Sequence, residues 1–167
     1  MAKITFRGTP VNLVGEFVQP GTQAPDFTLV KGDLTDFHLA DNNGKFLLLN
    51  IFPSLDTGVC ATSVRKFNKL AASMPNTIVL AVSKDLPFAQ GRFCTTEGIE
   101  NVVPVSDYKY TSDFAQKYGI LMEDGPLAGL LARSVVVINP EGKVIYSELV
   151  PEIAQEPNYE AALNAIK

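Results

Sequence analysis

The chain has 167 residues, a formal net charge of −4 and a sequence pI of about 5.0. Hydrophobic residues make up 46% and charged residues 19%, which predicts a packed core rather than a disordered chain. The acidic balance argues against nucleic acid and anionic lipid as partners. No apolar run approaches the roughly 18 residues of a membrane span.

Two cysteines and a single histidine limit the metal chemistry that the chain can support. They exclude a zinc finger, a four-cysteine iron–sulfur site and a multi-histidine metal site, so we expect no metal or other cofactor. Residues 1–7 lack the apolar stretch of a signal peptide, which favours a cytoplasmic location, or a periplasmic one if a leader was removed. In a reducing cytosol, a pair of cysteines is more often catalytic than structural.

The predicted elements begin with a hairpin of residues 3–7 and 11–14 around a turn at 8–10. Short strands follow at 27–30 and 37–39, and residues 46–52 form an apolar run typical of a strand buried on both faces. The later elements are a helix at 60–72, strand 77–83, helix 87–97, strand 102–105, helix 112–118, strands 134–138 and 144–149, and helix 158–166.

This order alternates strands and helices before ending in an antiparallel strand pair and a helix. We therefore expect an α/β fold of the thioredoxin-like class, with a central mixed β-sheet, helices on both faces and an N-terminal β-hairpin. The length fits one domain that spans residues 1–167.

The chemistry concentrates in the segment PSLDTGVC, residues 53–60, which follows the most apolar strand and precedes a helix. Open α/β sheets bind ligands at this end of a strand. If Thr57 is the N-cap, Cys60 is the third residue of the helix, and the Thr57 hydroxyl can accept its backbone N–H. The thiol then faces the positive end of the helix dipole.

The helix dipole alone does not ionise a thiol. Ionising most of an ordinary thiol at neutral pH requires about 3.4 kcal/mol, and a helix terminus typically supplies about 0.3–1 kcal/mol. Arg65 and Lys66 lie away from the Cys60 face of the helix. Arg133, immediately before the apolar strand 134–138, is the other candidate cation, unless it is a solvated charge at a strand end.

The spacing of Pro53, Thr57 and Cys60 matches the P-x-x-x-T-x-x-C signature of peroxiredoxins, with a matching arginine at Arg133. Further similarity at residues 63–68, 85–90 and 92–94 extends over essentially the whole chain. The sequence resembles the bacterial thiol peroxidase group, the atypical two-cysteine peroxiredoxins.

The resemblance implies a peroxidase that reduces hydrogen peroxide and organic or lipid hydroperoxides. Cys60 would attack the peroxide and become a sulfenic acid, while Thr57 and Arg133 hold the reacting oxygens and Pro53 shields the site. Cys94 would resolve the sulfenic acid as an intramolecular disulfide. Thioredoxin would be the reductant, and the protein would be a homodimer.

Alternatives remain at this level. Cys60 and Cys94 are also compatible with inert buried thiols, a static disulfide, or a redox sensor without peroxide turnover. Because they lie on different predicted helices, one helix must partly unwind for the sulfurs to meet. His38 is expected to face solvent and to have no catalytic role, whereas Phe88 and residues 121–131 could line the site or belong to the core.

Overall fold

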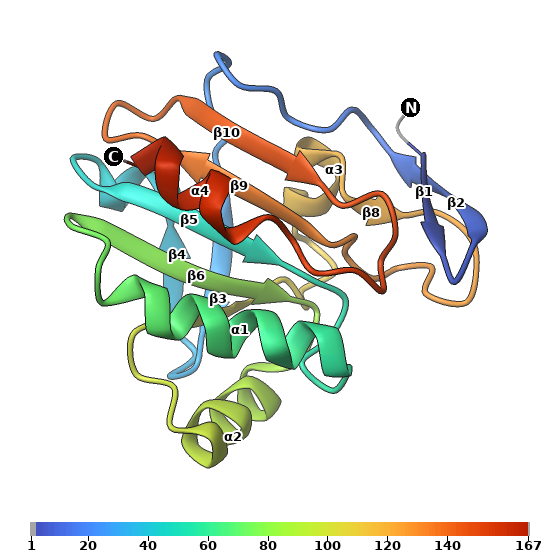
Figure 1. Ribbon diagram of the computed structural model, residues 1–167, viewed down its shortest axis with the longest axis horizontal. Helices are drawn as coiled ribbons and strands as arrows, with labels where there is room; N and C mark the ends of the chain where they lie inside the picture. The colour runs from blue at the N-terminus through green and yellow to red at the C-terminus, as the bar shows by residue number, and fades with distance from the viewer. Residues whose placement is uncertain (1–2, 167) are drawn as a thin grey trace.

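The computed structural model describes residues 3–166, and Figure 1 labels its elements. In chain order these are β1 (Lys3–Phe6), β2 (Thr9–Val14), β3 (Thr28–Lys31), β4 (Asp36–His38), the 3-10 helix η1 (Leu39–Asn42), β5 (Phe46–Ile51), α1 (Gly58–Ala71), β6 (Thr77–Ser83), α2 (Pro87–Glu97), β7 (Val103–Ser106), α3 (Phe114–Tyr118), β8 (Leu121–Met122), β9 (Ser134–Ile138), β10 (Val144–Leu149) and α4 (Tyr159–Ile166).

The central sheet has seven strands in the order β10-β9-β5-β6-β7-β3-β4. Strands β5, β6 and β7 are parallel, and the other neighbouring pairs are antiparallel, which confirms the expected mixed sheet. The carboxyl ends of the three parallel strands therefore share one edge, and the segment 52–57 leaves β5 there to enter α1. This edge carries the candidate site.

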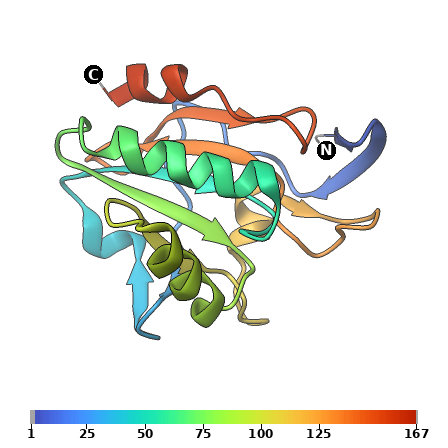
Figure 2. The ribbon, with the colours of Figure 1, turned by 60° about the horizontal axis from the view of Figure 1, so that its bottom comes forward.

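Alternate side chains of the buried strands point to opposite faces of the sheet, and each face has its own core. On one face, Leu48 packs in a cluster with residues of α1 and α4, including Phe67. On the other face, Leu47 and Leu49 pack in a cluster with α3 residues such as Phe114. Figure 2 shows α1 and α4 on the same side of the sheet, with α2 beside α1. Both faces are covered, as the alternating order predicts.

The N-terminal hairpin is present, and with β8 it forms a separate three-stranded sheet. Its turn differs from the prediction, because β2 already begins at Thr9 and the turn consists of Arg7 and Gly8. Both turn residues have positive φ, 52° and 82°, as a two-residue hairpin loop with the right twist requires. The loop is therefore shorter than the proline at position 10 suggested.

Other differences are small. Helix α3 begins at Phe114 instead of residue 112. Ser112 belongs to the preceding turn, where its hydroxyl donates to Asp107. The sequence pattern missed η1 and the two-residue strand β8, which are too short to show a period. Within residues 3–166, no helix combines the length and apolarity that crossing a bilayer would need.

Candidate active site

The loop after β5 brings Cys60 to the first turn of α1. Thr57 has the extended backbone of an N-cap, so Cys60 is the third helical residue, as expected. The Cys60 side chain is 0% exposed, and Val64 and Phe67 of the same helix pack in its cluster. Because these residues recur at helical spacing, burying that face of α1 also fixes the sulfur against the sheet.

Thr57 does not cap the helix with its side chain, so the predicted bond from its hydroxyl to the Cys60 N–H is wrong. The hydroxyl instead donates to the carbonyl of Ser54 at 3.1 Å, and the Thr57 backbone N–H bonds the same carbonyl at 3.2 Å. The turn formed by residues 54–57 thus holds the Thr57 side chain through its hydroxyl proton, in an orientation in which the oxygen accepts no bond from the Cys60 N–H. The oxygen lone pairs of Thr57 are left to accept a hydrogen bond from another group.

Arg133 reaches Cys60 through the pairing of β9 with β5. The antiparallel register places Ser134 opposite Ile51, so Arg133 lies beside the start of the loop that leads to Cys60. Its Nη2 lies 3.1 Å from Cys60 Sγ, and its Nε donates to the carbonyl of Ile153 at 2.7 Å. The structure therefore places Arg133, the candidate cation, in contact with the Cys60 thiol.

The guanidinium of Arg133 is buried, at 1% exposure, and contacts no carboxylate among the described residues. A buried charge is costly unless a counter-charge or hydrogen bonds compensate it. The Cys60 sulfur, which lies within hydrogen-bond distance of the Arg133 guanidinium, can become such a counter-charge by losing its proton. Nη1 has no hydrogen-bond partner within the described part of the chain, so one donor of the fork remains available.

A cavity of about 200 Å³ opens on Arg133. Its lining residues are mostly apolar and come from the N-terminal hairpin, the loop before α1, the first turn of α1, and the loops after β8 and β10. They are Phe6, Arg7, Pro53, Thr57, Gly58, Val59, Leu127, Arg133, Ile153 and Ala154. Of residues 121–131, which were expected to form an apolar rim or part of the core, Leu127 lines this cavity. Phe88 is 68% exposed and is not a lining residue of this cavity.

Glu152 joins the hairpin to the loop that carries Ile153. Its carboxylate accepts bonds from the Gly8 and Ala154 N–H groups and from the Thr5 hydroxyl. These bonds, the one from the Ala154 N–H first, lower the pKa of Glu152 from 4.5 to about 2. The same loop supplies the carbonyl that orients Arg133, so Glu152 supports the site from outside.

Cys94 lies on α2 and is half-buried. It packs against the apolar cluster that contains Cys60, and both cysteines are free thiols. Burial raises the pKa of the Cys94 thiol. Gly98 ends α2 in the left-handed conformation, with its N–H bonded to the Cys94 carbonyl, as the sequence pattern predicted.

Asp85 was not singled out by the chemical reasoning from sequence. Its carboxylate accepts the Ser54 hydroxyl at 2.7 Å, the Leu55 N–H at 2.8 Å and the Ser83 hydroxyl at 2.8 Å. It follows β6, as the Cys60 loop follows β5, and the carboxyl ends of parallel neighbours meet at one edge. The sequence could have placed Asp85 beside the Cys60 loop, because both follow strands of one predicted strand–helix–strand unit, and these strands are parallel neighbours in the sheet.

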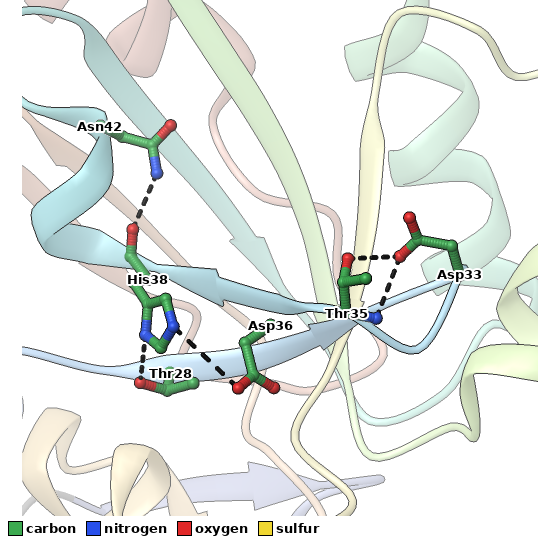
Figure 3. Close-up of polar contacts among 6 residues, drawn as sticks. All are labelled: Thr28, Asp33, Thr35, Asp36, His38 and Asn42. Atoms are coloured by element: carbon green, nitrogen blue, oxygen red, sulfur yellow. Dashed lines mark hydrogen bonds and ion pairs between the residues drawn. The ribbon is translucent and has the colours of Figure 1, made fainter.

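The other cations and the histidine lie elsewhere. Arg65 pairs with Glu97, and Lys66 lies over the ring of Tyr159 at 4.7 Å. His38 is on β4 and 46% exposed in its side chain. Figure 3 shows its ring between Thr28 and Asp36, with Nδ1 2.9 Å from the Thr28 hydroxyl oxygen. This agrees with the expectation that His38 faces solvent.

Comparison with known proteins places this site in a family. A Redoxin family model matches residues 19–163. The chain is 58% identical over 166 residues to a thiol peroxidase of Mycobacterium tuberculosis and 55% identical over 166 residues to one of Corynebacterium glutamicum, covering 99% of each chain in both cases. A crystal structure of a peroxiredoxin-like protein from Aquifex aeolicus matches with a TM-score of 0.93 at 42% identity, covering 99% of this chain and 96% of that one. The chain therefore belongs to the thiol peroxidases, Redoxin-family enzymes that reduce peroxides through a cysteine thiol.

Proposed function

We propose that Cys60 is the peroxide-reducing cysteine and that Arg133 stabilises its thiolate. The observation that carries this assignment is the 3.1 Å contact from Arg133 Nη2 to Cys60 Sγ in a buried environment without a competing carboxylate among the described residues. A guanidinium at this distance favours an anionic sulfur, and low local polarity strengthens the attraction. The thiolate is the form of cysteine that acts as a nucleophile.

The thiolate attacks the terminal oxygen of the hydroperoxide, and the O–O bond breaks as the S–O bond forms. The sulfur is oxidised to a sulfenic acid, and the second peroxide oxygen leaves as an alkoxide or hydroxide, which takes up a proton from solvent to give an alcohol or water. Arg133 Nη1, without a partner in residues 3–166, donates to the oxygens that gain charge. The Thr57 oxygen accepts a hydrogen bond from the peroxide O–H and so orients the O–O bond. Pro53, which has no N–H, shields the sulfur from water.

Cys94 then resolves the sulfenic acid. Its thiolate attacks the Cys60 sulfur, and the S–O bond breaks as the disulfide forms; the hydroxide that leaves takes up a proton to give water. We expect α2 to unwind for this step more readily than α1. Helix α2 buries Pro87 and Gln90, whereas α1 buries five residues, including the large Phe67. A helix with little buried apolar surface opens at low cost.

Thioredoxin is the proposed reductant, and the cytoplasm is the proposed location. Both follow from the family resemblance, and two free thiols suit a reducing compartment. The apolar walls of the cavity favour organic hydroperoxides as substrates alongside hydrogen peroxide. The comparisons give no support to a sensor without turnover, because the curated relatives are thiol peroxidases.

A homodimer is proposed as well. Four large apolar side chains are exposed after β6 and β7, at the edge that carries the site: Leu86, Phe88, Tyr108 and Tyr110. The bond from the Asp107 N–H to the Ser83 carbonyl, 2.9 Å, joins the two stretches that carry them. Covering these side chains in a dimer would remove apolar surface from water. Sedimentation of the wild type and of Phe88→Ser tests this, because a patch in the interface predicts weaker self-association of the variant.

The deciding experiment follows peroxide consumption by the wild type, Cys60→Ser and Cys94→Ser with thioredoxin and thioredoxin reductase. Cys60→Ser should consume no peroxide. Cys94→Ser should reduce one equivalent and stop at the sulfenic acid, which a dimedone adduct detects by mass. Sustained turnover of Cys94→Ser at the wild-type rate would refute the intramolecular disulfide, and full activity of Cys60→Ser would refute the whole assignment.

A further inference from the structure

A chain of polar contacts connects the loop that carries Cys60 to the helix that carries Cys94. On the loop side, the Asp85 carboxylate accepts the Ser54 hydroxyl and the Leu55 N–H. On the helix side, Ser83 donates its hydroxyl to Asp85 at 2.8 Å and accepts Gln90 Nε2 at 3.1 Å. Asp85 is the member of this chain that contacts the loop directly.

The loop contacts of Asp85 bear on the position of Cys60. The Ser54 carbonyl accepts bonds from both the N–H and the hydroxyl of Thr57, and Thr57 is the N-cap of α1. Fixing Ser54 and Leu55 therefore fixes the start of α1. The third residue of that helix, Cys60, is held in turn against Arg133.

The helix contacts of the same chain bear on Cys94. Gln90 is one of the two buried residues of α2, at 0% exposure, and its Nε2 also donates to the Val105 carbonyl at 2.9 Å. Gln90 thus anchors α2 to Ser83 and β7 by hydrogen bonds, in addition to the packing of the half-buried Phe93 and Cys94 against the apolar cluster. Gln90 Oε1 has no partner among the described residues, so this network is already incompletely satisfied, and removing another member leaves further buried groups unpaired and costs stability.

We propose that Asp85 is a positioning residue that sets the balance between the folded dithiol form and the unwound form in which the Cys60–Cys94 disulfide closes. The inference rests on the proposed roles of the two cysteines. Cys60 and Cys94 are unpaired and lie on different helices, so we expect disulfide formation to move the loop or α2 out of the folded arrangement. The bonds of Asp85 and Ser83 oppose that movement. Asp85 touches neither peroxide nor sulfur, so it acts through the position of the loop.

The test compares Asp85→Ala with Asp85→Asn. Alanine removes all the acceptors, whereas the asparagine oxygen can still accept the Leu55 N–H and the Ser83 hydroxyl, both of which bond Oδ2 in the native protein. The matched control is Asp33→Ala, because Asp33 also accepts a backbone N–H and a hydroxyl, both from Thr35, in the exposed turn between β3 and β4 (Figure 3).

The first readout is the reduction potential of the Cys60–Cys94 disulfide, measured by equilibration with a glutathione or dithiothreitol buffer. Asp85→Ala weakens the folded dithiol form, so the potential should become more negative by about 30 mV, which corresponds to about tenfold in the equilibrium constant. Asp85→Asn should shift the potential less, and Asp33→Ala should leave it at the wild-type value. An unchanged potential in Asp85→Ala overturns the proposal.

The second readout is the fate of the sulfenic acid. With excess peroxide it either condenses with Cys94, releasing water, or is oxidised by a second peroxide to sulfinic acid, releasing alcohol or water. Asp85→Ala should give less sulfinic acid by mass spectrometry and a slower first reaction of Cys60, both by several-fold. A residue with a merely structural role would destabilise the reduced and oxidised proteins equally in urea and leave this partition unchanged, which would also overturn the proposal.

A third variant, Ser54→Ala, covers the case that Asp85→Ala does not fold. It removes the bond that Ser54 donates to Asp85 and the bond that the Asp56 N–H donates to the same hydroxyl, and it keeps the Leu55 bond. It should shift the potential in the same direction by a smaller amount, and no shift would again count against Asp85. If the wild type consumes no peroxide, the proposed function fails. If the wild type turns over but the variants keep its potential and partition, this inference alone fails.

Discussion

Arg133 and Cys60 are 73 positions apart in the chain, and Arg133 Nη2 lies 3.1 Å from Cys60 Sγ. Two features of the fold make this contact. The antiparallel register of β9 with β5 sets Arg133 beside the loop, and the Ile153 carbonyl holds the guanidinium in orientation through Nε. The contact explains how a thiol at a helix terminus can gain more stabilisation of its anion than the helix dipole supplies.

Replacing Arg133 by alanine should therefore reduce both the thiolate content of Cys60 at neutral pH and its rate of reaction with peroxide. The rate should fall by about 10²- to 10³-fold, the range typical for removal of a preorganised donor to developing charge. Ultraviolet absorbance of the thiolate, recorded in a Cys94→Ser background, measures the first effect, and rapid-mixing kinetics the second.

Arg65→Ala is the matched control for charge. Arg65 is on α1 near Cys60 in sequence, but its guanidinium pairs with Glu97. Its removal should leave the thiolate absorbance unchanged. If Arg133→Ala kept the wild-type absorbance, the guanidinium would have no part in ionising the sulfur.

Burial raises the pKa of Cys94, so in the folded enzyme this thiol should be unreactive near neutral pH. In Cys60→Ser, alkylation of Cys94 by iodoacetamide should be slow at pH 7 and rise with pH through pH 9, because only the thiolate reacts. The same variant unfolded in urea should react faster at each pH. Equal rates in the folded and unfolded states would show that burial does not control this thiol.

Helix α2 should exchange its amide hydrogens faster than α1 in the reduced protein. With Pro87 and Gln90 as its buried residues, α2 loses little packing when it opens, while α1 would expose Val64 and Phe67. We expect about tenfold faster exchange or more for peptides of α2, measured by hydrogen–deuterium exchange and mass spectrometry. Slower exchange in α2 than in α1 would assign the unwinding to α1 instead.

Glu152→Gln should lower stability at neutral pH and matter less in acid. The carboxylate has a folded pKa of about 2 against an ordinary 4.5, so its contribution is present above pH 4.5 and is lost as the pH falls towards 2. Urea unfolding at pH 7 and pH 3 measures this, with a smaller difference between variant and wild type expected at pH 3. A difference that grows in acid would contradict the assignment.

Sequence alone determined the parts of this protein that depend on local pattern. The apolar run of β5, the helical spacing of Cys60, Val64 and Phe67, and the glycine that ends α2 predicted the alternating fold and the place of the cysteine at a helix start. The spacing from Pro53 to Cys60 indicated the chemistry. These features are readable because side-chain periodicity and backbone preference act within a few residues.

Tertiary structure alone decided which distant groups meet. The contact of Arg133 with Cys60 depends on the register of β9 with β5, and the position of Asp85 beside the Cys60 loop depends on the register of β6 with β5. Strand register leaves no periodic signal in the chain, because the residues that it brings together come from separate strands and loops. The site is thus assembled where the sheet edge brings those segments together.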